Sequence, residues 1–97
     1  MKGDIGEVLK ELYRVIEERK RELPEGSYTA ELFKKGEDRI LQKVGEEAIE
    51  TILALKSGNK DEAVYEVSDL LYHLLVALVK KGIKLDDIGE ELKRRMK

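Results

Sequence analysis

Apolar side chains recur at three- and four-residue intervals along nearly the whole chain, which is the pattern of amphipathic helices. Glycines and the single proline interrupt this pattern and mark where helices end. No segment shows the strict alternation of apolar and polar residues that is typical of a half-buried strand. The expected fold class is therefore all-α, a bundle of four to five helices. The predicted helices cover residues 5–22, 29–35, 37–57, 61–81 and 86–96.

Length and composition limit the class of protein. A chain of 97 residues predicts one domain, 1–97, with a modest core. The absence of cysteine excludes disulfides and thiolate metal sites and fits a cytoplasmic location. A net charge of −2 provides no overall field for nucleic acid, so we expect no nucleic-acid partner. No apolar run approaches the ~20 residues of a membrane span, and the N-terminus lacks the apolar core of a secretory signal, so we expect no membrane partner.

Three glutamates stand where a core is expected in the helix predicted over 37–57. On a helical wheel, Glu46, Glu47 and Glu50 form a stripe with apolar residues on both sides. The broader apolar arc is expected to be buried. It consists of Ile40, Leu41, Val44, Ala48, Ile52 and Leu55. Gly45 costs this helix roughly 1 kcal/mol relative to alanine, which predicts a close helix crossing or a substrate that approaches the backbone.

The helix predicted over 61–81 carries the complementary stripe. It is apolar around most of its circumference, which predicts a buried helix. Its few polar positions, Glu66, Asp69, His73 and Lys80, fall on one narrow face. Because only a short link separates 57 from 61, the two long helices are expected to be antiparallel neighbours. Their acidic stripes can then face each other.

Carboxylates that meet in a partly dry cleft raise one another's pKa, and desolvation adds to that effect. A divalent cation relieves the repulsion. Ligands that offer only oxygen suit Mg²⁺, Mn²⁺ and Ca²⁺, and Mg²⁺ usually completes its shell with water and substrate phosphates. The motif Glu-Glu-x-x-Glu, then fifteen intervening residues, then Glu-x-x-Asp, therefore predicts a magnesium–phosphate site.

At these residues the chain resembles a known family. The paired acidic motif is similar to that of the all-α nucleoside triphosphate pyrophosphohydrolases, which include the MazG-like proteins and the dimeric dUTPases. Within this superfamily the chain resembles the phosphoribosyl-ATP pyrophosphohydrolases of histidine biosynthesis. Three stretches carry the resemblance, which extends from about Val8 onward: "GSYTAELFKKG" at 26–36, "KVGEEAIE" at 43–50 and "EVSDLLYHLLVAL" at 66–78. The chain is shorter than expected for members with a fused cyclohydrolase domain.

The resemblance implies Mg²⁺-dependent hydrolysis of 1-(5-phosphoribosyl)-ATP to 1-(5-phosphoribosyl)-AMP and pyrophosphate, with Mn²⁺ as a substitute. It implies four metal ligands: Glu47, Glu50, Glu66 and Asp69. Glu46 is expected to ligate through water or to orient the nucleophile, and one carboxylate among Glu46, Glu47 and Glu50 is expected to be the general base. Lys43 and Arg39 lie one and two turns before the acids and are expected to contact a phosphate. Ser27, Tyr28 and Thr29 are expected to help hold the substrate.

Simpler interpretations stand beside these. The three glutamates of 46–50 also fit a solvated helix edge, and Ser27 or Thr29 also fits a helix cap. His73 is interpreted as a core histidine bonded to a metal-binding carboxylate or to Tyr65. A di-iron bundle is disfavoured because such proteins use Glu-x-x-His pairs and this chain has one histidine. A non-enzymatic helical domain and another nucleotide pyrophosphohydrolase of the superfamily remain as alternatives.

The helix predicted over 61–81 also bears on assembly. Three or four short companions within 97 residues can hardly cover a helix that is apolar on nearly every side. Uncovered apolar area on this scale indicates an interface. A two-fold homodimer is therefore expected, as the family resemblance also implies.

Overall fold

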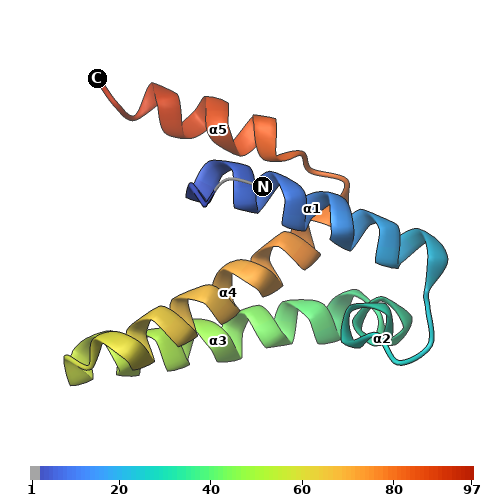
Figure 1. Ribbon diagram of the computed structural model, residues 1–97, viewed down its shortest axis with the longest axis horizontal. Helices are drawn as coiled ribbons and strands as arrows, with labels where there is room; N and C mark the ends of the chain where they lie inside the picture. Colours follow the sequence, from blue (N-terminus) through green and yellow to red (C-terminus); the bar gives the residue numbers. More distant parts are fainter. Residues whose placement is uncertain (1–2) are drawn as a thin grey trace.

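The computed structural model describes residues 3–97, and over that range the protein is helical, with no strand (Figure 1). The predicted all-α class is confirmed. Each end of each helix lies within two residues of its predicted place. The helices are α1 (Ile5–Glu22), α2 (Tyr28–Lys35), α3 (Glu37–Ser57), α4 (Lys60–Lys81) and α5 (Leu85–Arg94). Within the described range, no helix combines the length and the apolar character that crossing a membrane requires.

Side chains and backbone conformation fix the helix ends as local chemistry predicts. Asp4, Ser27 and Asn59 accept hydrogen bonds from the first-turn amides of α1, α2 and α4. Gly58 ends α3 in the predicted left-handed conformation, at φ 80°. Leu23 ends α1 in the same region at φ 48°, which is uncommon for a residue with a Cβ.

The two longest helices form the frame of the molecule. The helices α3 and α4 run antiparallel, and α1 and α2 pack at the end that holds the C-terminal half of α4, while α5 lies beside α1 (Figure 1). The core lies where α1, α2, α3 and α4 meet. Its buried members are Tyr13, Ile16, Leu32, Phe33, Ile40, Leu75, Val76, Ala77 and Val79.

Two expectations about burial are wrong for a single copy of the chain. The helix α4 is buried only in its C-terminal half, from His73 onward, and Val64 in its first half is exposed. In α3, Ile52 is 64% exposed, and Leu41 and Leu55 are exposed as well. For Ile52, Leu55 and Val64 the physical reason is length: the second half of α3 and the first half of α4 extend beyond α1 and α2, so there each helix has only the other as a neighbour (Figure 1).

Gly45 does not mark a close helix crossing within the chain. A Cβ added at this position would meet no atom within 4 Å apart from its own helix. The predicted crossing is therefore wrong for the single copy, and the approach of a substrate to this backbone remains a prediction.

Candidate active site

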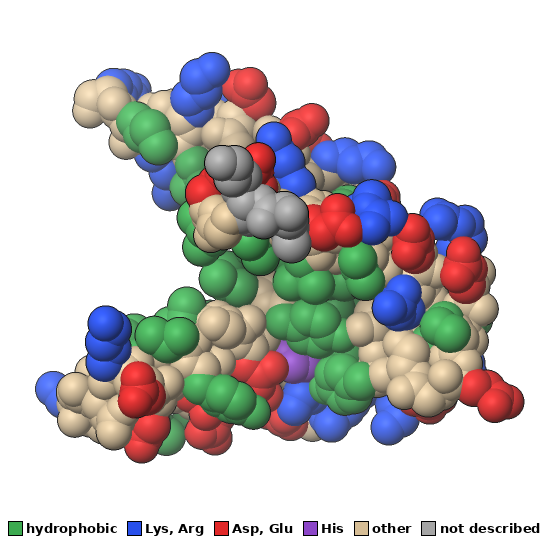
Figure 2. Space-filling view, viewed as in Figure 1, with side chains coloured by type: hydrophobic (Ala, Val, Ile, Leu, Met, Phe, Trp, Pro, Cys, Tyr) green, Lys and Arg blue, Asp and Glu red, His purple; other side chains and the backbone are tan. Residues whose placement is uncertain are grey.

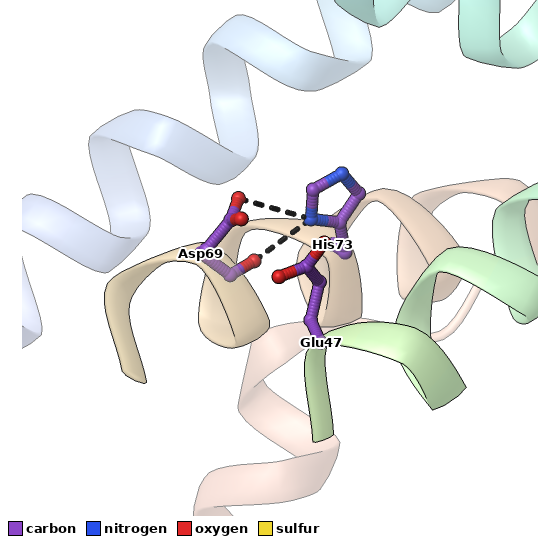
Figure 3. Close-up of side chains that lie close together, drawn as sticks. All are labelled: Glu47, Asp69 and His73. Atoms are coloured by element: carbon purple, nitrogen blue, oxygen red, sulfur yellow. Dashed lines mark hydrogen bonds and ion pairs between the residues drawn. The ribbon is translucent and has the colours of Figure 1, made fainter. Parts of the chain in front are cut away.

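Glu47 and Asp69 bring the two acidic stripes together. Glu47 comes from α3 and is only 7% exposed, while Asp69 comes from α4 and is half-buried. An oxygen from each carboxylate and a ring nitrogen of His73 all lie within 4.8 Å of one another (Figure 3). Burial raises the pKa of Asp69, and so does the Glu47 carboxylate, with which a protonated Asp69 shares a hydrogen bond.

Lys43 forms an ion pair with Glu47. Its ammonium lies 3.1 Å from a Glu47 oxygen and 3.5 Å from Glu46, and this contact with Glu47 raises the pKa of Lys43. Burial pushes the pKa of Glu47 upward, but the hydrogen bond with Asp69 and the contact with Lys43 outweigh it and leave the pKa lowered. The expectation that all these carboxylates have raised pKa values is therefore wrong for Glu47. The helix places Lys43 one turn before it, where a cation can offset burial.

Glu46 points to basic residues of its own helix. Its carboxylate pairs with Lys43 and, at 3.6 Å, with Arg39. The structure thus joins Arg39, Lys43, Glu46 and Glu47 in one chain of charges along α3. Both predicted phosphate-contacting cations lie beside the acids, and both carry carboxylate partners.

Glu50 and Glu66 face each other across a small acidic pocket. The pocket has a volume of about 290 Å³, and its lining includes both side chains and Glu62. Desolvation raises the pKa of Glu66, and the charges of Glu50 and Glu47 add to that rise. Glu62 was missed by the sequence analysis, although it stands four residues before Glu66 and so shares its helix face.

Thr51 was also missed. It is buried between the two acidic helices, and its hydroxyl lies 2.8 Å from the Glu47 carbonyl oxygen and 3.1 Å from that of Glu66. It therefore ties α3 to α4 at the level of the acids. The signal available in the sequence was its position, four residues after Glu47 on the same face.

The segment Ser27–Tyr28–Thr29 lies beside the acids, and its side chains have partners within the protein. Ser27 is the N-cap of α2, which confirms the capping interpretation. Thr29 is buried and hydrogen-bonded to the Tyr72 hydroxyl. Tyr28 is 52% exposed, and its hydroxyl lies 2.9 Å from His73 Nε2.

His73 connects this segment to the acids. Its Nδ1 lies 2.8 Å from the Asp69 carbonyl oxygen and 3.3 Å from a carboxylate oxygen of the same residue (Figure 3). The expected contact with an acid of the site is confirmed. The alternative partner Tyr65 is wrong: that residue is exposed, and the tyrosine bonded to His73 is Tyr28.

The donor set fits a hard divalent cation. Glu47, Glu50, Glu66 and Asp69 offer oxygen only, and desolvation together with neighbouring carboxylates raises the pKa values of Glu66 and Asp69. Fold and cluster together define a class: an all-α bundle with paired acidic motifs on two antiparallel helices.

Comparison with known proteins identifies the family within that class. The sequence model described as phosphoribosyl-ATP pyrophosphohydrolase matches residues 9–96. The chain is 53% identical to phosphoribosyl-ATP pyrophosphatase of Metallosphaera sedula, over 94% of this chain and 98% of that protein. It is also 53% identical to the phosphoribosyl-ATP pyrophosphatase of Clostridium acetobutylicum, over 95% of this chain and 84% of that protein. The chain therefore belongs to the phosphoribosyl-ATP pyrophosphohydrolase family, and the resemblance drawn from the sequence is confirmed.

Some relatives are longer. The chain is 59% identical to the histidine biosynthesis bifunctional protein HisIE of Caldanaerobacter subterraneus, over 94% of this chain. It spans only 44% of the length of that relative.

Proposed function

We propose that this chain hydrolyses 1-(5-phosphoribosyl)-ATP to 1-(5-phosphoribosyl)-AMP and pyrophosphate, the second step of histidine biosynthesis. Family membership supports this reaction. The single observation that carries it is the meeting of Glu47 and Asp69 between α3 and α4, with Glu50 and Glu66 in the adjoining pocket. Residues 1–97 would act as one domain, and a step of amino-acid synthesis would take place in the cytoplasm.

Glu47, Glu50, Glu66 and Asp69 would hold Mg²⁺, with Mn²⁺ as a substitute. The bound cation would supply charge stabilisation for the phosphates. Lys43 and Arg39 lie beside these acids and would contact phosphate oxygens of the substrate, exchanging part of their present pairing with Glu46 for the ligand. The expected nucleotide partner and the basic pair are complementary in charge.

The chemical step needs a proton acceptor. Water attacks the α-phosphorus, the bond from that phosphorus to the bridging oxygen breaks, and pyrophosphate leaves with the bonding electrons. A carboxylate oxygen accepts the proton of the attacking water. Glu46, Glu47 and Glu50 are the candidates. Glu46 is exposed, and the contacts with Asp69 and Lys43 lower the pKa of Glu47.

Tyr28 is the member of its segment best placed to touch the substrate, since its ring is half exposed beside the acids. Ser27 and Thr29 would support this contact by fixing the start of α2 through the cap and through Tyr72.

A panel of nucleotides tests the reaction. Purified protein with Mg²⁺ should release pyrophosphate from 1-(5-phosphoribosyl)-ATP much faster than from ATP or dUTP. Faster release from an ordinary or damaged nucleotide would instead favour another pyrophosphohydrolase of the superfamily. No release from any nucleotide would favour a non-enzymatic helical domain.

We also propose that the chain assembles as a two-fold homodimer. The exposed apolar side chains on α3 and the first half of α4 support this, and Figure 2 shows a hollow between these helices and the α1–α5 side, with hydrophobic side chains along its wall. Such area is seldom left to water. These exposed side chains include Ile49, Ile52, Leu53, Leu55 and Val64.

Sedimentation at micromolar concentration should give the mass of a dimer. Ile52→Glu should shift the chain toward monomer, because it places a charge on the proposed interface. Lys35→Glu, at the exposed end of α2, is the control and should leave the dimer intact. A stable wild-type monomer would refute the assembly.

A further inference from the structure

A line of hydrogen bonds runs from the surface to the acidic site through one buried ring. The Tyr28 hydroxyl lies 2.9 Å from His73 Nε2, and His73 Nδ1 lies 2.8 Å from the Asp69 carbonyl oxygen. The ring is only 2% exposed, and the rings of Tyr28 and Tyr72 both meet it edge-on. It therefore has little freedom to turn.

The partners determine which nitrogen carries the proton. A carbonyl oxygen only accepts, so Nδ1 must donate to Asp69. In the neutral ring Nε2 then has a free electron pair, and the Tyr28 hydroxyl donates to it. The Nδ1 atom also lies 3.3 Å from a carboxylate oxygen of Asp69, a longer contact beside its hydrogen bond to the carbonyl oxygen.

We propose that His73 is a positioning residue that holds the Asp69 carboxylate on α4 and the Tyr28 hydroxyl at the start of α2 in fixed register. This inference rests on the proposed function, because His73 affects activity only if the segment of Tyr28 holds substrate and Asp69 holds metal. Donors that orient a ligating carboxylate in this way commonly change metal affinity or activity by 10–100-fold when they are removed.

The same geometry separates this role from that of a ligand. An Nδ1 that bears hydrogen has no electron pair for a cation, and Nε2 faces Tyr28. His73 therefore acts on the site through Asp69 and does not enter it, although its ring lies close to both carboxylates (Figure 3).

Nitrogen NMR of the labelled protein tests the proton placement without any turnover. The chain has one histidine, so its ring signals need no assignment. We expect hydrogen on Nδ1 and none on Nε2, both without and with saturating Mg²⁺. Hydrogen on Nε2 alone, or loss of the Nδ1 hydrogen when Mg²⁺ binds, would overturn the proposal.

Two substitutions of His73 distinguish the effect of the Nδ1 bond to Asp69 from that of the Nε2 bond to Tyr28. The amide nitrogen of Asn reaches the place of Nδ1, and that of Gln reaches the place of Nε2. His73→Gln should therefore weaken Mg²⁺ binding, measured by calorimetry, by about 10–100-fold, whereas His73→Asn should change it less than threefold. Equal losses of Mg²⁺ affinity in His73→Gln and His73→Asn, with the melting temperature unchanged, would contradict the assignment of the hydrogen to Nδ1.

Tyr28→Phe removes the other bond with an exposed ring left in place. It should raise KM roughly fivefold and leave kcat near that of the wild type, and Tyr28→Phe combined with His73→Asn should be no worse than either alone. Additive effects would mean that the hydroxyl binds substrate directly and would overturn the proposal. Tyr65→Phe, an exposed tyrosine of α4, is the control and should keep the wild-type KM.

Different measurements test the proposed function and the positioning role of His73. If the wild type releases no pyrophosphate from any nucleotide, the proposed function fails. The ring tautomer and the Mg²⁺ affinities of the His73 variants still support or overturn the positioning role.

Discussion

Replacing any one of Glu47, Glu50, Glu66 or Asp69 by its amide should lower turnover of 1-(5-phosphoribosyl)-ATP by at least ~100-fold, the scale of losing one positioned charge in catalysis. The four side chains come from two helices and meet at the Glu47–Asp69 contact and in the adjoining acidic pocket. Steady-state rates of pyrophosphate release with saturating Mg²⁺ measure the loss. Helix content, followed by circular dichroism, should survive each change.

The matched control is Glu90→Gln, which removes the same charge from exposed α5. Its turnover should stay within twofold of the wild type, since surface substitutions away from special features change little. If two of the four amide variants keep near-full activity while Glu90→Gln also does, the proposed site is wrong.

Metal binding should stabilise the fold in a pH-dependent way. The folded protein raises the pKa of Asp69, through burial and the Glu47 carboxylate, and that of Glu66, through desolvation and its acidic neighbours. A raised folded pKa contributes stability below the unfolded value, near pH 4, and this contribution is lost as the pH rises through the folded value. Glu47 has a lowered pKa and acts in the opposite sense: its contribution is present at neutral pH and is lost on acidification.

At the proposed site, Mg²⁺ would relieve the destabilisation caused by Asp69 and Glu66 at high pH, because it would bind only where these carboxylates converge. At a hundredfold excess over its dissociation constant, a ligand of the native state adds about 2.7 kcal/mol. For a chain of this size that corresponds to a rise in melting temperature of roughly 10–20 °C. We expect such a rise with Mg²⁺ or Mn²⁺ at pH 8, and little change at pH 4, where protons compete for the carboxylates.

A double variant tests the origin of this effect. Glu50→Gln with Glu66→Gln should raise the melting temperature of the metal-free protein, because two facing charges are removed, and should abolish the shift with Mg²⁺. The control pair Asp86→Asn and Glu90→Gln removes two charges from α5 and should keep the wild-type shift. A double variant at 50 and 66 that keeps the full shift would contradict a metal between the stripes.

The helices and the facing of the acidic stripes could be predicted because both depend on local rules. Spacing of apolar residues, caps and glycines determine the helix ends, and the short link after Gly58 makes α3 and α4 antiparallel. Once the stripes face each other, Glu47 and Asp69 are brought together. The sequence therefore sufficed for the placement of the principal carboxylates.

The remaining features depend on contacts between distant residues. A helical wheel shows Ile52 as apolar but not which face α1 and α2 leave uncovered. The link from Tyr28 to His73 joins residues 45 positions apart, so no spacing rule indicates it. The lowered pKa of Glu47 depends on the balance of burial against Lys43 and Asp69, which only coordinates can give.

The most direct test of the central claim is the location of Mn²⁺ in crystals of the wild-type protein, found by anomalous scattering. We expect a peak between α3 and α4, bound by carboxylate oxygens from Glu47, Glu50, Glu66 and Asp69, with His73 outside the coordination shell. A peak held by His73 Nδ1, or the only peak at carboxylates outside this cluster, would contradict it.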